Sequence, residues 1–359
     1  MKEEKGDKKG QFHIRRAAAF LFLGVVAFFC ILNLAMNNWR SEAVLGRAVF
    51  TPVKTGTDIL LGQRKSEGVF LGEGDYLLEE IAAPKEKELA DKLEAIEHFR
   101  KEYPGVGFYF MLVPNAANIL KEMLPSGAVT EDQAEQFEKI QKQLGSGITW
   151  VDGQAALEKN KGEAIYYHTD SHWTMLGAYY GYQELAAAMS LDLSQEPEFD
   201  VYPVSGSFNG DLAERSGYRR SYGEPIYVYS MKEGQGPEFI VSYPEEERRT
   251  GTLYDSSKLS GGNMYDVFLG GDAPVVEIQT TVENTNRLLV VKDSYANCLL
   301  PFLLPYYREI VVIDPALYTG DIRQVMEERK ITSVLFLYNG NTFIKDAHIS
   351  GVLADGKTE

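Results

Sequence analysis

The chain has 359 residues, of which 44% are hydrophobic and 12% aromatic. This length and composition support a large buried core and exclude general disorder. The formal net charge of −16 repels nucleic acids and anionic lipid surfaces, which argues against a polynucleotide partner.

The first distinct segment is an uncharged apolar run over residues 17–36, just long enough to span a bilayer as a helix. Four basic residues between positions 8 and 16 precede it, against a lone Arg40 beyond it. The positive-inside rule therefore predicts a cytoplasmic tail (1–16), a transmembrane helix and an extracellular main domain. The alternative is a cleaved signal peptide, but the apolar run exceeds a usual signal core and "NLAMNNW" is a poor cleavage site.

Beyond the predicted membrane helix, residues 37–65 have the character of a stalk or lead-in, and residues 66–359 form the predicted folded domain. The only cysteines are Cys30, inside the apolar run, and Cys298. The exported domain therefore has no intramolecular disulfide, and its core must supply its stability.

The domain alternates predicted strands and helices, which is the pattern of an α/β fold with a parallel sheet sandwiched by helices. Between 191 and 280 the long helical patterns stop, and short alternating runs such as "PIYVYS" predict an antiparallel β insert. The predicted strands lie at 68–80 (a hairpin), 107–114, 148–152, 287–294, 309–315 and 333–341, and the predicted helices at 84–105, 131–144, 173–190, 295–307 and 320–329.

A candidate nucleophile follows the apolar strand in "RLLVVKDSYAN". Ligands of open parallel sheets gather outside the carboxyl ends of strands, where this sequence places Ser294. At the start of the next helix, the Ser294 N–H can stabilise the oxyanion that forms when a serine attacks an ester.

A candidate base lies in "YYHTDSHWTMLGAYY" (166–180), where His168, Asp170 and His172 alternate and can point to one side of an extended segment. Asp170 can orient the imidazole of His172, which predicts a triad in the chain order Asp170, His172, Ser294. One alternative is a zinc site formed by the three alternating side chains. The other is a structural pair in which Asp170 caps the next helix and His172 packs beneath Trp173.

Further substrate-binding candidates follow from position and residue type. Asn339 and Asn341 end the last predicted strand and could supply a second oxyanion donor, with Asn339 slightly preferred. Trp173 and its neighbouring tyrosines could stack on a sugar, although their spacing favours the core between helix and sheet.

The stretches "YYHTDSHWT" and "VKDSYAN" resemble the DHHW family, membrane-anchored relatives of the alginate O-acetylation proteins within the SGNH hydrolase superfamily. The stretches "GVFLGEGDYLLEE", "FYFMLVPNAANIL", "SFNGDLAERSG" and "REIVVIDPALY" support this resemblance, which covers about residues 65–345. It implies a flavodoxin-like SGNH fold that is circularly permuted, because the Asp/His block precedes the nucleophile.

The resemblance also implies the triad roles for Asp170, His172 and Ser294 and an oxyanion role for Asn339 or Asn341. The sequence departs from the family pattern at two positions: Ser171 replaces the second residue of Asp-His-His-Trp, and Lys292 replaces the glycine of Gly-Asp-Ser. The glycine of the superfamily's second block is not evident.

These observations predict an O-acetyltransferase or acetylesterase that forms an acyl-serine on a cell-envelope polysaccharide or exopolysaccharide. The chemistry needs neither a metal nor a cofactor. Acetyl-CoA is cytoplasmic, so transfer outside the cell requires a membrane partner, and the resemblance implies a membrane-bound O-acyltransferase. The alternative is a non-catalytic polysaccharide-binding or assembly protein that keeps the SGNH fold.

Overall fold

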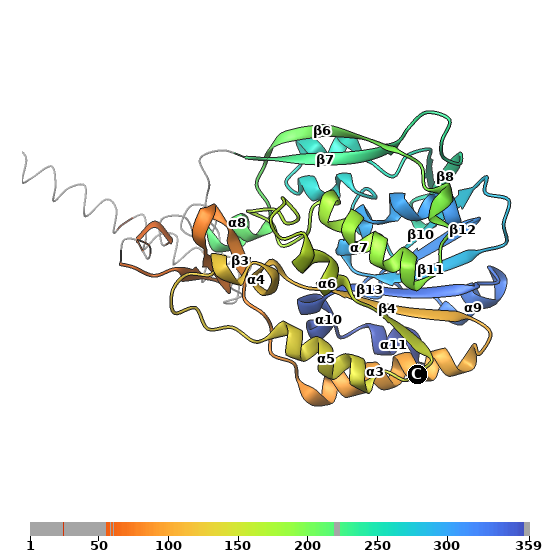
Figure 1. The fold of residues 1–359 in the computed structure, drawn as a ribbon, viewed down its shortest axis with the longest axis horizontal. Coiled ribbons are helices and arrows are strands. Elements are labelled where there is room, and N and C mark those ends of the chain that lie inside the picture. Colours follow the sequence, from red (N-terminus) through yellow and green to blue (C-terminus); the bar gives the residue numbers. More distant parts are fainter. Residues whose placement is uncertain (1–23, 25–54, 58, 60, 219–222, 355–359) are drawn as a thin grey trace, which may run out of the picture. The chain divides into compact units, whose positions relative to one another are not determined.

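The computed structural model describes residues 24, 55–57, 59, 61–218 and 223–354 (Figure 1). The predicted cytoplasmic tail and nearly all of the predicted membrane helix lie outside these residues. Among the residues described, no helix combines the length and apolar character needed to cross a membrane. The described residues from Gln63 onward form one compact unit.

The unit is built on an eight-stranded mixed sheet with the order β5-β4-β13-β11-β12-β10-β8-β9. The five strands from β5 to β12 are parallel, and β10, β8 and β9 continue the sheet in antiparallel fashion. The strands are β4 (Gly107–Val113), β5 (Ile148–Val151), β8 (Phe239–Tyr243), β9 (Arg248–Thr250), β10 (Val275–Thr280), β11 (Arg287–Lys292), β12 (Glu309–Ile313) and β13 (Ser333–Asn339).

The parallel strands are predominantly apolar, with polar residues mainly at their ends, because both of their faces are covered. Successive side chains of a strand alternate between two separate hydrophobic clusters: in β4, Phe110 belongs to one and Met111 to the other. Figure 1 shows α3, α5, α10 and α11 on one side of the sheet and α7 on the other. The helices are α3 (Glu86–Glu102), α4 (Ala116–Ile119), α5 (Gln133–Gln143), α6 (Gly153–Lys159), α7 (Met175–Ala188), α8 (Asp211–Ser216), α9 (Ile322–Glu328), α10 (Gly340–Lys345) and α11 (Ile349–Leu353).

A three-stranded antiparallel sheet precedes α3, formed by β1 (Lys65–Ser66), β2 (Val69–Leu71) and β3 (Leu77–Glu79). The Leu77 N–H donates to the carbonyl of His168 at 2.7 Å. This small sheet therefore contacts the loop in which the sequence predicts the base.

The segment predicted as an insert has the expected antiparallel strands, but they divide between two sheets. β6 (Phe199–Phe208) and β7 (Glu224–Met231) pair only with each other, whereas β8, β9 and β10 extend the main sheet. β10 alternates buried and more exposed residues and pairs antiparallel with β12, so it prolongs the buried sheet. The predicted parallel sheet is present as the five strands from β5 to β12, and three antiparallel strands of the predicted insert region extend it into a mixed sheet.

The helix predicted over 295–307 is also wrong in type. The segment forms two consecutive 3₁₀ helices, η8 (Ser294–Cys298) and η9 (Leu300–Tyr306). Pro301 and Pro305 lack the N–H that an α-helix requires, and a proline ring clashes with the preceding turn. The segment keeps its apolar burial without α-helical geometry.

Replacing Phe110 with alanine should destabilise the fold. Phe110 is fully buried and its ring contacts those of Trp150, Phe336 and Phe343. We expect Phe110→Ala to lower the free energy of unfolding by about 3–5 kcal/mol in chemical denaturation. Tyr202→Ala is the control because Tyr202 is 51% exposed, and equal losses in both variants would contradict this packing.

Candidate active site

The candidate site lies where strand connections diverge at the carboxyl edge of the parallel sheet. The chain leaves β4 toward β5 at one side and leaves β11 toward β12 at the other, with β13 between them. Such a divergence opens a crevice outside the strand ends. Ser294 begins η8 two residues after the end of β11 and therefore lies at this crevice.

Hydrogen bonds connect three of the side chains predicted from the sequence. His172 Nδ1 lies 2.6 Å from Asp170 Oδ1, and His172 Nε2 lies 2.7 Å from Ser294 Oγ. The His172 N–H also donates to Asp170 Oδ1, at 2.9 Å. The structure therefore brings Asp170, His172 and Ser294 together across 122 positions of sequence.

The carboxylate determines which ring nitrogen of His172 carries the proton. An ionised carboxylate only accepts, so the Nδ1–H of His172 donates to Asp170, and in the neutral ring Nε2 accepts from the Ser294 hydroxyl. Burial opposes ionisation of Asp170, but the charge and hydrogen bonds of His172 outweigh it and keep the pKa of Asp170 low. Burial likewise opposes protonation of His172, but Asp170 raises the pKa of His172 above its usual value.

Aromatic side chains enclose the imidazole. The ring of Tyr265 stacks on His172 with centroids 3.8 Å apart, and Tyr295 packs against it at 4.7 Å. The Tyr295 hydroxyl donates to the carbonyl of Ser171, so the turn of the nucleophile and the loop of the base contact each other directly. This packing restricts rotation of the ring and excludes water from one of its faces.

Trp173 has a structural position. Its side chain is fully buried, and its Nε1–H donates to the carbonyl of Tyr295 at 2.9 Å. Trp173 therefore joins the base loop, which carries His172, to the turn that begins with Ser294, and it does so from within the core. A fully buried ring cannot stack on a sugar, so the structure favours the core alternative for Trp173.

The segment "SFNGDLAERSG" supports Asp170 from the side opposite His172. The Asp211 N–H donates to Asp170 Oδ2 at 3.1 Å, and the Ser171 N–H donates to Asp211 Oδ1 at 2.8 Å. A Cβ atom on Gly210 would lie 2.2 Å from the Asp170 Cβ, so only glycine fits there. The sequence prediction missed these roles, although the Gly-Asp pair lies in a stretch that carries the family resemblance.

The two predicted oxyanion asparagines have other partners. Asn339 caps α10, accepting from the N–H groups of Asn341 and Thr342, and its amide donates to the Val113 carbonyl. The Asn341 amide donates to Glu79 and to the carbonyl of Glu80, and its oxygen accepts from the Ala82 N–H. The structure therefore uses both side chains to join the ends of strands and the segments that follow them.

Lys292, the last residue of β11, is buried and forms ion pairs, which the sequence prediction did not include, with the buried Asp314 and the more exposed Asp272. Its Nζ lies 2.7 Å from Asp272 Oδ1 and 3.3 Å from Asp314 Oδ2. Burial disfavours the charge, but the two aspartates outweigh it and raise the pKa of Lys292. The residue that replaces the family glycine thus links the ends of β11 and β12 beside Ser294.

His168 faces a different carboxylate from His172. Its Nδ1 lies 3.2 Å from Glu224 Oε2, and its ring stacks on Tyr76 with centroids 3.9 Å apart. In the part of the chain that the structure describes, no three His, Cys, Asp or Glu side chains converge as metal ligands. The zinc alternative for His168, Asp170 and His172 therefore has no support in the geometry.

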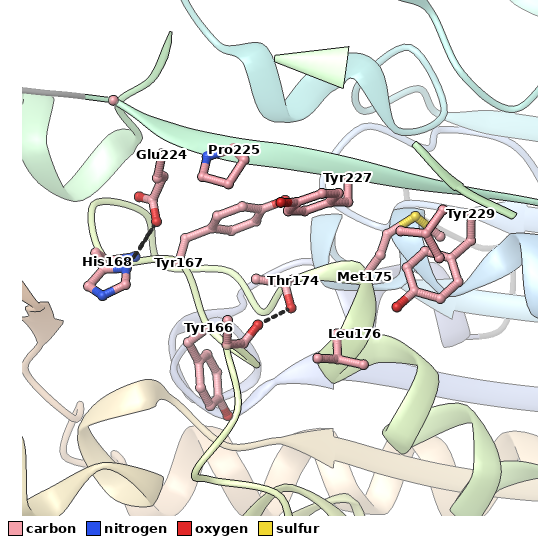
Figure 2. A pocket seen from close by; sticks show the side chains of 13 residues that line it. Tyr166, Tyr167, His168, Thr174, Met175, Leu176, Glu224, Pro225, Tyr227 and Tyr229 are labelled. Atoms are coloured by element: carbon pink, nitrogen blue, oxygen red, sulfur yellow. Dashed lines mark hydrogen bonds and ion pairs between the residues drawn. The ribbon is translucent and has the colours of Figure 1, made fainter. Parts of the chain in front are cut away.

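An apolar cleft of about 380 Å³ lies on the other side of the base loop, between β6–β7 and the start of α7 (Figure 2). His168 and Glu224 lie at one end of it and contact each other. Figure 2 shows the aromatic and apolar side chains that line most of the remainder, among them Tyr166, Tyr167, Met175, Leu176, Tyr227 and Tyr229.

Comparison with known protein families identifies the class. The family model for the SGNH hydrolase-like domain of the acetyltransferase AlgX matches residues 69–254, just over half of the chain. The chain therefore belongs to this family of SGNH-like proteins. The match includes Asp170 and His172 and ends before Ser294.

Individual relatives agree with this assignment. The chain is 28% identical over 167 residues to a probable alginate O-acetylase AlgJ from Pseudomonas syringae pv. tomato, covering 43% of each protein. It therefore spans less than half the length of that curated relative. The resemblance to the DHHW family and the alginate proteins, predicted from the sequence, is confirmed.

Solved structures share the fold. A DHHW family protein from Eubacterium siraeum superposes with a TM-score of 0.68 at 22% identity, covering 80% of this chain and 95% of that one. Bacillus cereus PatB1 with a sulfonyl adduct gives a TM-score of 0.66 at 22% identity, covering 79% and 97%. At this identity the likeness establishes the SGNH-like α/β fold.

The pH dependence of Ser294 reactivity tests the contact with His172. The neutral imidazole accepts the serine proton, so labelling by a fluorophosphonate should increase with pH through the raised pKa of His172, above 6.5. In Asp170→Asn, the charge that raises the pKa of His172 is lost while its burial remains, so the inflection of the pH profile should move to lower pH. The maximal labelling rate should fall roughly a hundredfold or more. An unchanged inflection would contradict the contact.

Gly210 provides a steric test of how Asp170 is held. Gly210→Ala places a methyl group against Asp170 and should slow fluorophosphonate labelling of Ser294 by roughly a hundredfold. Gly206→Ala is the matched control, since a Cβ there meets nothing within 4 Å. Equal labelling of the two variants, measured by mass spectrometry, would show that this contact does not control the site.

Proposed function

We propose that the chain is a membrane-anchored, extracytoplasmic O-acetyltransferase or acetylesterase that acts on a cell-envelope polysaccharide or exopolysaccharide through an acetyl-Ser294 intermediate. The observation that carries the proposal is the line of hydrogen bonds from Asp170 through His172 to Ser294. Membership of the AlgX acetyltransferase family supports the reaction class.

The first half of the reaction forms the acyl-enzyme. His172 Nε2 takes the Ser294 proton while Oγ attacks the acetyl carbonyl, and Asp170 stabilises the resulting imidazolium. When the tetrahedral intermediate collapses, His172 returns the proton to the leaving oxygen of the donor. Asp170 remains ionised throughout, in keeping with its lowered pKa.

The second half transfers the acetyl group. His172 takes a proton from an acceptor hydroxyl, the resulting oxygen attacks the acetyl-serine, and Ser294 Oγ regains the proton as the new ester leaves. A sugar hydroxyl as acceptor makes the protein a transferase, and water as acceptor makes it an esterase.

The Ser294 backbone N–H is our proposed oxyanion donor. It is the first N–H of η8, at the point where Oγ attacks. Because η8 is a 3₁₀ helix of five residues, the proposal rests on this backbone N–H and not on a helix dipole. The second donor that the sequence predicts, Asn339 or Asn341, stays a proposal, and either side chain would have to provide it beside the hydrogen bonds that it already forms.

The substrate class and the anchor rest on other grounds. The names of the relatives, an acetyltransferase AlgX and a probable alginate O-acetylase AlgJ, support a polysaccharide acceptor. The uncharged run over 17–36 and the basic residues before it support the membrane anchor and the extracellular site. Acetyl groups must then cross the membrane, so we include a membrane-bound O-acyltransferase as the partner that supplies them.

Turnover of an aryl acetate by the full-length chain tests the proposal. Wild-type protein should release the aryl alcohol and give an adduct on Ser294 with a sulfonyl fluoride, because His172 activates the hydroxyl. Ser294→Ala should reduce turnover to the uncatalysed rate. Ser257→Ala is the control: Ser257 forms an Asx-type contact with Asp255 in the 3₁₀ segment Ser256–Ser260 and should leave turnover unchanged.

Absence of both turnover and the Ser294 adduct would reject the enzyme and favour the polysaccharide-binding alternative. If turnover is present, adding an oligosaccharide acceptor and measuring its acetylation distinguishes a transferase from an esterase. A transferase moves the acetyl group to an oligosaccharide hydroxyl, as detected by mass spectrometry, and an esterase releases acetate alone.

A further inference from the structure

The loop that carries the base is held mainly by contacts from distant segments. Two backbone hydrogen bonds join the ends of this loop. The Thr174 N–H donates to the Ile165 carbonyl, and the Tyr167 N–H donates to the His172 carbonyl. Tyr166 and Trp173 form an isolated bridge. The tip of the loop between these contacts belongs to no helix or strand, so its shape depends on its side-chain partners.

Glu224, the first residue of β7, contacts two residues at the tip of the loop through its carboxylate. Its Oε2 accepts from the His168 N–H at 2.8 Å and lies 3.2 Å from His168 Nδ1. Its Oε1 accepts from the Thr169 N–H at 2.9 Å and from the Thr169 hydroxyl at 2.5 Å. Figure 2 shows Glu224 and His168 facing each other at the end of the apolar cleft.

This carboxylate is buried yet fully satisfied. Glu224 is 7% exposed, and burial alone would favour its neutral form. The hydrogen bonds from His168 and Thr169 outweigh burial and lower the pKa of Glu224. A buried carboxylate with four donors rigidifies the segment that supplies them, because any movement of the loop leaves a charge without partners.

Thr169 links Glu224 to the segment that also holds Asp170. Its hydroxyl oxygen accepts from the Gly210 N–H at 3.0 Å, and its carbonyl accepts from the Ala213 N–H at 3.1 Å. Asp170 follows directly and accepts from the Asp211 N–H. The residue before Asp170 is therefore fixed from two directions, by β7 and by the segment that starts α8.

We propose that Glu224 is a positioning residue: it holds the tip of the loop through Thr169 so that Asp170 and His172 keep the geometry that faces Ser294. This inference rests on the proposed function for its kinetic consequence. The geometric part is independent of turnover, because it concerns the hydrogen bond between Asp170 and His172.

Glu224→Gln tests the role with little change in volume. The amide places a donor where the carboxylate accepted, opposite one of the loop N–H groups. We expect kcat for aryl acetate hydrolysis by the full-length chain to fall about tenfold with KM unchanged, as expected when one buried hydrogen bond is replaced by an unfavourable contact. Glu198→Gln is the matched control, because Glu198 precedes the β6–β7 pair and forms an exposed ion pair with Lys232.

Proton NMR reports directly on the hydrogen bond between His172 and Asp170, and a general loss of stability would not change this signal in the folded protein. The Nδ1–H of His172, bonded to Asp170, should give a downfield resonance that is absent in His172→Ala. We expect Glu224→Gln to shift or broaden this resonance and Glu198→Gln to leave it in place. Thr169→Val removes the hydroxyl that donates to Glu224 and accepts from the Gly210 N–H, and it should also shift or broaden the resonance. The effects of the two substitutions should be less than additive in the double variant, because both remove the hydrogen bond between Glu224 and the Thr169 hydroxyl.

The outcomes separate this inference from the proposed function. Absent wild-type turnover with a resonance that still depends on Glu224 rejects the proposed reaction and supports the positioning role. A Glu224→Gln protein with wild-type kcat and an unchanged resonance overturns the positioning role, even if its melting temperature is lower. Circular dichroism of each variant excludes global unfolding as the cause.

Discussion

A buried carboxylate fixes the proton of the imidazole that faces Ser294, and the geometry of the site depends on that one hydrogen bond. Without Asp170, His172 would lose its preferred tautomer, and its burial would lower its affinity for a proton. The surrounding residues hold the two side chains of this hydrogen bond in place. Tyr265 covers one face of the ring, and Gly210 lets a supporting segment approach Asp170 closely.

The sheet explains why these groups meet. Parallel strands end at a common edge, so residues far apart in sequence arrive at one crevice. At that edge, polar side chains hold the strand ends in register: Asn339 spans β13 and β4, and Lys292 joins β11 to the loop after β12. Removing the Lys292 cation would leave the buried carboxylate of Asp314 without its ion-pair partner, so this ion pair also constrains the end of the strand that precedes the nucleophile.

Much of this architecture could be predicted from the sequence, because burial on both faces gives parallel strands an apolar signature. The alternation of His168, Asp170 and His172 likewise indicated a site. Other features leave no local pattern. The contacts of Glu224 join residues about 55 positions apart, and the positions of Asn339 and Asn341 at a strand end did not reveal which partners their amides would take.

The pairing of β4 with β13 joins residues as far apart as 226 positions. Because β13 is the central strand of the parallel sheet but follows the other four parallel strands in the chain, the sheet has a gap between β4 and β11 until β13 is synthesised. Contacts of such high sequence separation form slowly, since the chain must close a long loop before any burial compensates for the lost entropy. A partly synthesised chain therefore contains the loop of His172 and the turn of Ser294, but the crevice between them is completed only when β13 joins the sheet.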